Sequence, residues 1–228
     1  MGILLGFLKK LTQRCMDKKI LIMVLSIEMA PFNTMIDGIK KTWGNFNNDN
    51  VDICYYYGNS DVPKMIDKNI YLPVRDTFGN ILKKTLLAFD YVDKNFEFDY
   101  VYRCCTGSYI DIEKLIEYVK NKPKQGYYSG YLGEHAGVPY CSGSGFFLSR
   151  DLLKFLYCGH SGEQPVCDDV DIGKFMHNHC GIVAENAPRF DGPFDDENYD
   201  DSYFHYHFRT DLSALHFVHE KKRKNNEN

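Results

Sequence analysis

The sequence predicts a single-domain, three-layer α/β/α sandwich with a mainly parallel mixed sheet. Two observations lead to this prediction. Short, continuous apolar runs bounded by polar residues are typical of strands covered on both faces, and longer segments between them place apolar residues at helical spacing. The length of 228 residues is enough for one large core or two small ones, and we expect one domain.

The first half of the chain shows this alternation most clearly. Residues 20–25 form an apolar run after two lysines, which predicts a central strand. A helix is expected over residues 31–43, where Met35, Ile36 and Ile39 fall on one face and Gly44 follows its end. The other elements expected here are strands over 51–57, 70–72 and 98–102 and a helix over 80–95.

The second half of the sequence also predicts alternating helices and strands, and it contains one segment of small residues and one acidic segment. Asp111 is expected to be the N-cap of one helix and Asp171 that of another. The expected elements are helices over 111–119, 150–157 and 171–179, strands over 127–132, 146–148 and 203–209, a small-residue loop over 141–145 and a long loop over 187–201.

The two ends of the chain are expected to lie outside the domain at 18–220. Residues 1–17 predict an amphipathic helix that lies on the domain, with weak peripheral membrane contact by its apolar side chains as the alternative. Residues 221–228 predict a charged, disordered tail. No apolar run reaches the ~18 residues that a transmembrane helix requires. The apolar side chains of the first segment are Ile3, Leu4, Leu5, Phe7 and Leu8.

Charge and cysteine content exclude some classes of protein. The net charge of −4 argues against nucleic acid as a partner, since nucleic-acid-binding domains carry a basic excess. The eight cysteines show no Cys-x-x-Cys spacing, and a disulfide between the adjacent Cys104 and Cys105 would be strained. We therefore expect reduced thiols and a cytoplasmic location.

Two segments stand out as candidates for chemistry when they are considered together. The loop Ser142, Gly143, Ser144 and Gly145 lets a backbone approach a ligand closely, and an acidic pair follows about 25 residues later. Each segment alone is more typical of a turn or a helix cap. Their spacing allows one cleft at the end of the sheet, near the strand that ends at residue 102, to hold both.

From about residue 19 to residue 173 the chain resembles a family of enzymes. It is similar to the fringe and β-1,3-galactosyl- and N-acetylglucosaminyltransferase group, and more closely to compact GT-A glycosyltransferases of large DNA viruses. The strongest matches are the segment Pro-Tyr-Cys-Ser-Gly-Ser-Gly-Phe-Phe-Leu-Ser at 139–149 and Asp168-Asp169-Val170 with Gly173. Weaker ones are 39–43, Asp76 with 80–85, and 98–103.

The resemblance implies an inverting GT-A glycosyltransferase that moves a sugar from a nucleotide-sugar, a UDP-sugar by analogy, to a glycan or glycoprotein hydroxyl. Asp169 aligns with the family's catalytic base. Asp168 is expected to orient the acceptor or to adjust the proton affinity of Asp169. In a viral protein the location would be the host cytoplasm. The resemblance further implies donor-binding roles for Ser26 and Asp76 and acceptor-binding roles for Ser142, Gly143, Ser144, Gly145, His207 and Arg209.

The chain departs from the family where the metal-binding acidic triplet belongs. It has Cys105-Thr106-Gly107 there, which offers no carboxylate to Mn²⁺ or Mg²⁺. The sequence leaves open whether Mn²⁺ or Mg²⁺ is a cofactor. His207 is the first candidate ligand, and Asp111 is a weaker one because it is expected to cap a helix. Without a metal, the donor diphosphate requires fixed positive charge and N–H groups. The candidates for this are Lys83, Lys84, Arg103, Thr106, Gly107, Ser108 and Arg209.

Two other functions are compatible with the same residues. The missing triplet favours a catalytically inactive GT-A-fold module that binds a sugar or a nucleotide. A hydrolase that uses Asp168 and Asp169 as acid and base is the third reading, but carboxyl groups on adjacent residues are poorly placed to flank one glycosidic bond.

Overall fold

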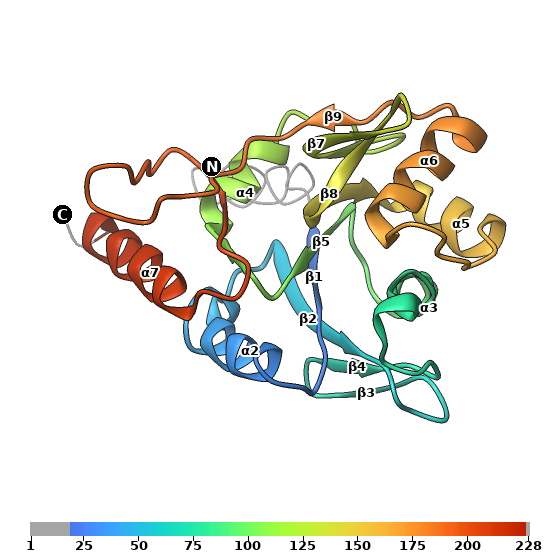
Figure 1. The fold of residues 1–228 in the computed structure, drawn as a ribbon, viewed down its shortest axis with the longest axis horizontal. Helices are drawn as coiled ribbons and strands as arrows, with labels where there is room; N and C mark the ends of the chain where they lie inside the picture. Colours follow the sequence, from blue (N-terminus) through green and yellow to red (C-terminus); the bar gives the residue numbers. More distant parts are fainter. Residues whose placement is uncertain (1–18, 227–228) are drawn as a thin grey trace, which may run out of the picture.

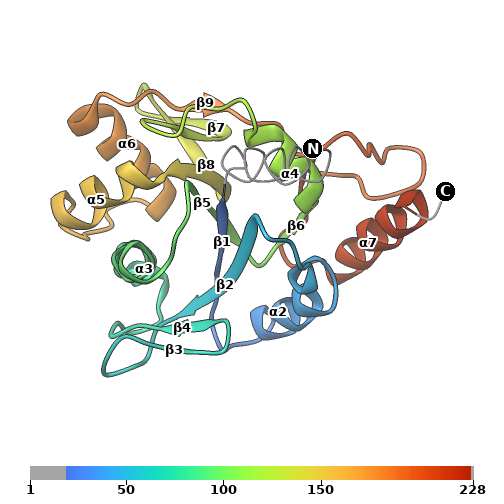
Figure 2. The same cartoon turned by 180° about the vertical axis from the view of Figure 1, so that it is seen from behind.

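The computed structural model describes residues 19–226, and the segment expected as an N-terminal amphipathic helix, 1–17, lies outside this range. A mixed sheet forms the middle layer, and helices cover both of its faces (Figures 1 and 2). The predicted three-layer α/β fold is confirmed. No helix within the described range is both long and apolar enough to cross a membrane.

The main sheet has the strand order β3-β4-β2-β1-β5-β8-β7-β9. The three central strands, β2, β1 and β5, run parallel, whereas β8 is antiparallel to both β5 and β7. The strands of this sheet are β1 (Ile20–Leu25), β2 (Val51–Tyr57), β3 (Lys64–Ile66), β4 (Asn69–Tyr71), β5 (Tyr100–Cys105), β7 (Tyr128–His135), β8 (Val138–Ser149) and β9 (Glu185–Asn186).

Side chains of β1 alternate between two hydrophobic cores because successive residues of a strand point to opposite faces. Ile20, Ile22 and Val24 pack on one side, while Leu21 and Met23 pack on the other. Buried residues of α2 (Phe32–Lys41), α4 (Ile112–Val119) and α7 (Leu212–Asn226) complete the first core. Those of α3 (Ile81–Asn95), α5 (Arg150–Gly159) and α6 (Asp168–Cys180) complete the second.

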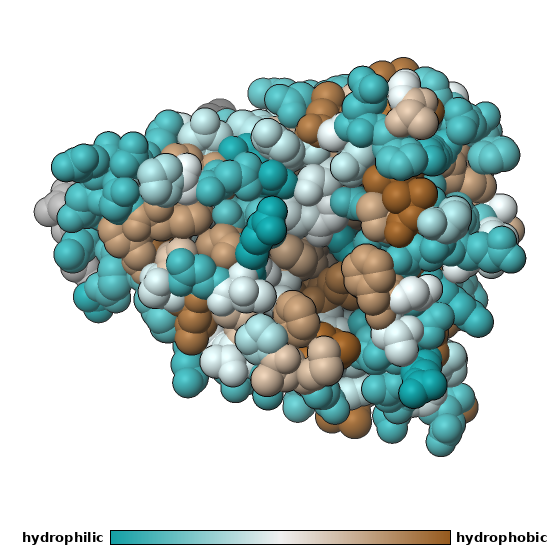
Figure 3. Space-filling view, viewed as in Figure 1, coloured by the Kyte–Doolittle hydropathy of each residue, from teal (hydrophilic) through white to brown (hydrophobic). Residues whose placement is uncertain are grey.

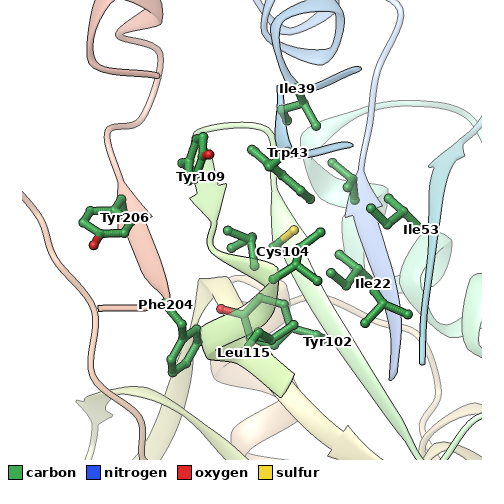
Figure 4. Close-up of a cluster of buried hydrophobic side chains, with 14 of the residues drawn as sticks. Ile22, Ile39, Trp43, Ile53, Tyr102, Cys104, Tyr109, Leu115, Phe204 and Tyr206 are labelled. Carbon is green, nitrogen blue, oxygen red and sulfur yellow. The ribbon is translucent and has the colours of Figure 1, made fainter. Parts of the chain in front are cut away.

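The first core is rich in aromatic side chains. In Figure 4, Tyr102 and Cys104 of β5 point to the same side as Ile22 of β1, toward Trp43 and Leu115. Trp43 lies in the short helix η1 (Trp43–Asn45), and a second short helix, η2 (Phe78–Asn80), precedes α3. Beside this core, β6 (Ser108–Ile110) pairs with β10 (His205–His207) in a small antiparallel sheet.

Several predicted boundaries are confirmed and others are wrong. Asp111 is the N-cap of α4, accepting a 3.1 Å hydrogen bond from the backbone of Lys114, as expected. By contrast, α7 continues to Asn226, so the expected tail at 221–228 is helical as far as the structure describes it. Lys222 in this stretch is buried and pairs with Asp111, which anchors the helix to α4.

Candidate functional site

The carboxyl ends of the three parallel central strands meet at one edge of the sheet. Ser26 follows β1, Gly58 follows β2 and Thr106 follows β5. Ligands of open α/β sheets bind at such edges. In Figure 3, hydrophobic side chains gather in a hollow over the central strands, and hydrophilic side chains surround it.

The small-residue segment 142–145 is part of β8 and is not the loop that the sequence predicted. Its pairing with β7 is interrupted: Phe146 pairs with Gly130 and Cys141 with Leu132, so one residue of β7 stands opposite four of β8. These four residues therefore form a bulge, which we call the β8 arch. Bulges re-aim side chains and are frequent beside functional sites.

Gly143 in the arch lies where no larger residue fits. A Cβ atom there would be 2.9 Å from Nη1 of Arg103 and 3.1 Å from Oδ2 of Asp169. Gly145 is similarly close to Tyr102, whose hydroxyl a Cβ would strike. The absence of these side chains lets β5 and α6 approach the arch.

Asp169 is attached directly to this arch. Its Oδ2 accepts a 2.6 Å hydrogen bond from the backbone N–H of Gly143, and its Oδ1 accepts one from Val170 at 2.9 Å. The residue remains partly exposed. The sequence expectation that the arch and the acidic pair share one region is thus met by direct contact.

Asp168 points the other way and forms a buried ion pair with Arg103. Arg103 also donates to the carbonyl of Gly143 at 2.5 Å and to the hydroxyl of Tyr56 at 3.1 Å. Burial raises the pKa of the Asp168 carboxyl, an effect that Arg103 opposes and the carboxylate of Asp169 reinforces. Arg103, expected to bind a diphosphate, is instead 1% exposed, and each of its three guanidinium nitrogens donates to a group inside the protein.

A second buried cluster joins Ser26, Asp76 and Lys84, which the sequence had placed on the donor side. The ammonium of Lys84 pairs with Asp76 and donates to the carbonyl of Ser26 at 2.8 Å. Asp76 also accepts from the backbone of Gly58 at 3.0 Å. The cluster ties the ends of β1 and β2 to α3, and burial lowers the pKa of Lys84.

Lys83, the neighbouring candidate, lies apart from this cluster. It is exposed and lines a groove between α3 and α5 together with Tyr157 and Gly162. Successive helical residues point about 100° apart, so only one of the two lysines can face the strand ends. The donor-binding expectation for Lys83 therefore does not agree with its position.

The segment after β5 packs against β10. His207 Nδ1 lies 3.0 Å from the carbonyl of Gly107 and 4.0 Å from the thiol of Cys105. Burial would raise the pKa of the Cys105 thiol, but His207, Ser108 and the backbone of Gly107 outweigh it, so the pKa lies below its ordinary value. Thr106 is buried in the same turn.

Ser108 and His205 form a hydrogen-bonded row beneath this segment. The hydroxyl of Ser108 donates to the carbonyl of Ser144 at 3.0 Å and lies 3.0 Å from Nε2 of His205. His205 Nδ1 lies 3.1 Å from the hydroxyl of Tyr102. Ser108 is fully buried, so it supports the arch rather than facing a ligand.

Arg209 is exposed and adopts a left-handed backbone conformation with φ of 57°. Gly107 lies against its backbone so closely that a Cβ at Gly107 would collide with it. Of the four cationic candidates for a diphosphate, Arg209 is the one both exposed and adjacent to this turn.

The residues after β5 do not fit a Mn²⁺ or Mg²⁺ site. These hard cations prefer carboxylate and carbonyl oxygens, whereas the side chains gathered here are the Cys105 thiol and the His207 imidazole. Nowhere in residues 19–226 do three or more His, Cys, Asp or Glu side chains gather as a metal site. His207, the candidate ligand, therefore belongs to no such group within this range.

Helix α6 begins earlier than the sequence predicted, at Asp168, with Cys167 as its N-cap. Asp171 is therefore not the cap but lies inside the first turn, where its carboxylate accepts from Val166 at 3.4 Å. Asp168 and Asp169 both belong to this turn, in which carboxylates interact favourably with the helix dipole.

Arg189, in the long loop after β9, also belongs to this region, although no sequence pattern points to it. Its Nη1 donates to the hydroxyls of Ser142 and Ser144 at 2.9 and 2.7 Å. The sequence likewise gives no sign of the role of Tyr56, whose buried hydroxyl binds Arg103 and Thr85. An isolated arginine in an acidic loop has no pattern that would single it out, and a tyrosine inside a strand is usually a core residue.

No protein-family model matches the sequence, and no curated protein matches it. Among solved structures, the chain is similar to a glycosyltransferase involved in the glycosylation of the major capsid of PBCV-1. The identity is 11% and the TM-score 0.46, over 87% of this chain and 98% of the other. It is also similar to the glycosyltransferase GlyE of Streptococcus pneumoniae TIGR4, with 10% identity and a TM-score of 0.43 over 75% of this chain. The match spans only 45% of GlyE.

Proposed function

We propose that this protein is an inverting GT-A glycosyltransferase that transfers a sugar from a nucleotide-sugar, a UDP-sugar, to a glycan hydroxyl, with Asp169 as the base. The observation that carries the proposal is the hydrogen bond from Gly143 to Asp169, which fixes a partly exposed carboxylate beside the ends of the parallel strands. The sequence resemblance assigns the base to this same residue.

In the proposed reaction the acceptor oxygen attacks the anomeric carbon of the donor sugar. The new carbon–oxygen bond forms as the bond to the diphosphate breaks, and the nucleoside diphosphate leaves with that electron pair. Asp169 takes the proton of the acceptor hydroxyl. Two backbone N–H groups hold its carboxylate in place, and such positioning is a large part of the catalytic effect.

The buried pair of Asp168 and Arg103 acts in this proposal as a positioning unit. Arg103 binds the carbonyl of Gly143, and the N–H of the same residue binds Asp169. Asp168 is thereby a positioning residue rather than a group that touches the acceptor.

On the donor side, the proposal places the diphosphate at the turn of Thr106 and Gly107. The exposed side chain of Arg209 lies next to this turn and supplies positive charge for the diphosphate. The structure supplies no oxygen-rich cation site there, so no step of the proposed reaction uses a metal ion.

The test is turnover of a panel of UDP- and GDP-sugars with simple glycosides as acceptors, with and without EDTA, measured as nucleotide release. We expect release that EDTA does not abolish. Asp169→Asn should reduce release by about 10²- to 10⁴-fold, because the amide keeps an oxygen for Gly143 but takes up no proton. Donor affinity, measured by calorimetry, should change little.

A matched control is Asp171→Asn, which alters a carboxylate in the same helical turn and should keep most of the turnover. Donor binding without any nucleotide release would favour the inactive binding module. Cleavage of a glycoside without a nucleotide donor would favour the hydrolase.

A further inference from the structure

Three residues of the β8 arch have no strand partner in the described part of the chain. Pairing of β8 with β7 is interrupted between Phe146 and Cys141, and pairing with β5 ends at Gly145. Residues 142–144 are therefore paired with neither strand. Strand pairing normally fixes the orientation of a peptide group in a sheet, so the orientation of the Gly143 peptide depends on other contacts.

The peptide groups of Gly143 are bound from one face of the arch. The carbonyl accepts a hydrogen bond from Arg103, and the N–H donates to Asp169. A Cβ atom on Gly143 would point at these same two side chains. Arg103 and Asp169 thus lie on the face of the arch toward which residue 143 is directed.

Arg189 binds the arch from the opposite face. Because successive residues of an extended segment point to opposite faces, the side chains of Ser142 and Ser144 are directed away from Asp169. Both hydroxyls accept a hydrogen bond from Nη1 of Arg189, at 2.9 and 2.7 Å. One guanidinium nitrogen therefore joins the two residues that flank Gly143.

The guanidinium of Arg189 is itself held in place. Its Nε and Nη2 donate to Asp191 at 3.1 and 2.9 Å, and its Cζ lies 3.9 Å from the ring centroid of Tyr131. The side chain is only 10% exposed. A charged donor makes a stronger hydrogen bond than a neutral one, so this fixed cation is well suited to hold the two serine hydroxyls.

The backbone around Arg189 is bound on both sides of the arch. The N–H of Ala187 donates to the carbonyl of Gly130 in β7 at 2.8 Å. The N–H of Phe190 donates to the carbonyl of His205 in β10 at 2.9 Å. Arg189 therefore extends from a segment that is attached to both the main sheet and the small sheet.

We propose that Arg189 is a positioning residue, which fixes the arch from the face opposite Asp169 and so keeps the Gly143 N–H directed at the carboxylate. It acts through Ser142 and Ser144 and does not touch the reacting atoms. Its effect on catalysis rests on the proposed glycosyl transfer. A misplacement of about 1 Å can lower the rate of a reaction by about 10²-fold, so a loosened arch should be visible in turnover.

The first test does not depend on turnover. Hydrogen exchange of the Gly143 amide is followed by NMR on the whole isotope-labelled protein, and the amide of Ile22, in the buried strand β1, reports global stability. We expect Arg189→Met to speed exchange at Gly143 about tenfold or more relative to Ile22. Arg150→Met is the matched control, because it removes an arginine that joins α5 to α3, and it should leave this ratio unchanged.

The second test is nucleotide release. Arg189→Met should lower kcat about tenfold or more and leave KM for the donor near the wild-type value. Arg189→Lys keeps the charge without the planar guanidinium and should be intermediate. The double variant Ser142→Ala with Ser144→Ala removes the two acceptors and should reproduce the effect of Arg189→Met, and combining all three changes should add little.

Unchanged exchange at Gly143 relative to Ile22 in Arg189→Met overturns the positioning role, even if nucleotide release proceeds. Independent, additive effects of Arg189→Met and the double serine variant also contradict it, since Arg189 would then act through another contact. Faster exchange at Gly143 in a protein that releases no nucleotide supports the hold of Arg189 on the arch and contradicts glycosyl transfer.

Discussion

The carboxylate of Asp169 accepts a 2.6 Å hydrogen bond from the backbone N–H of Gly143, a residue 26 positions earlier in the chain. The bond joins the first turn of α6 to the β8 arch. An amide that donates to a carboxylate makes one of the stronger hydrogen bonds in proteins, so the two elements hold each other in place.

Gly143→Ala is the first prediction. The new methyl group would lie 2.9 Å from Arg103 and 3.1 Å from Asp169, so the arch must shift and the carboxylate must move with it. We expect a loss of about 1–3 kcal/mol in the free energy of unfolding and at least a tenfold loss of nucleotide release. Urea unfolding and steady-state kinetics measure the two effects.

The control for this change is Gly79→Ala, where a Cβ atom meets nothing within 4 Å. It should leave both quantities close to the wild-type values. Full activity in Gly143→Ala would show that the carboxylate does not depend on the arch.

The buried pair of Arg103 and Asp168 gives a second prediction. Arg103→Met leaves the Asp168 carboxylate buried without its cation, which should cost about 3–5 kcal/mol of unfolding free energy. The double variant Arg103→Met with Asp168→Leu removes both charges and should recover much of this loss. A double-mutant cycle on unfolding free energies measures the coupling.

The same variant has a pH dependence of definite sign. Without Arg103 to oppose burial, the pKa of Asp168 rises further in the folded state than in the unfolded state. The folded protein then holds the proton more tightly than the unfolded chain. The stability of Arg103→Met should therefore fall as pH rises from the ordinary pKa of an aspartate to the raised pKa of Asp168 in the folded state. A loss that is independent of pH would mean that the carboxylate is solvated.

The fold could be predicted from the sequence because its strands are buried on both faces. The apolar runs at Ile20–Leu25 and Val51–Tyr57 have the observed bounds, since Asp52 is the one residue in these two ranges that is exposed. The short edge strand β3 was missed because its residues Lys64–Ile66 are all exposed and show no buried face.

The position of the candidate site could be predicted from the sequence, but the roles of its individual residues could not. The spacing of the arch and the acidic pair predicted one shared region, and Gly143 and Asp169 are in contact. Whether a charged residue at a strand end faces a ligand or the core depends on tertiary packing. Arg103 and Lys84 both face inward, and no local pattern distinguishes them from the exposed Lys83.

The thiol of Cys105 gives a third prediction. Its pKa lies below the ordinary value, whereas burial raises the pKa of the adjacent Cys104. Because the thiolate is the nucleophile, iodoacetamide near neutral pH should alkylate Cys105 and leave Cys104 unmodified. His207→Ala removes a group that lowers the pKa and should slow the reaction about three- to tenfold, as measured by peptide mass spectrometry.

The exposed Cys158 serves as the internal reference, since its rate should be the same in both proteins. Equal alkylation rates at Cys105 with and without His207 would show that the imidazole does not stabilise the thiolate.

The fourth prediction concerns stability in mild acid. His205 is buried, and its two ring nitrogens lie within hydrogen-bonding distance of Tyr102 and Ser108. Burial, His207 and Arg189 lower its pKa well below the ordinary value of 6.5. Between the lowered folded pKa and 6.5 the unfolded state binds the proton and the folded state does not, so stability should fall as pH falls below 6.5.

One such group contributes a slope of at most about 1.4 kcal/mol per pH unit. His205→Gln should lower the absolute stability but flatten this acid slope. Some slope should remain, because burial also lowers the pKa of His160 and His219. The measurement is urea unfolding between about pH 5.5 and 7.5, with His177→Gln, at an exposed histidine of α6, as the control that keeps the wild-type slope. A wild-type slope in His205→Gln would place the responsible proton on another histidine.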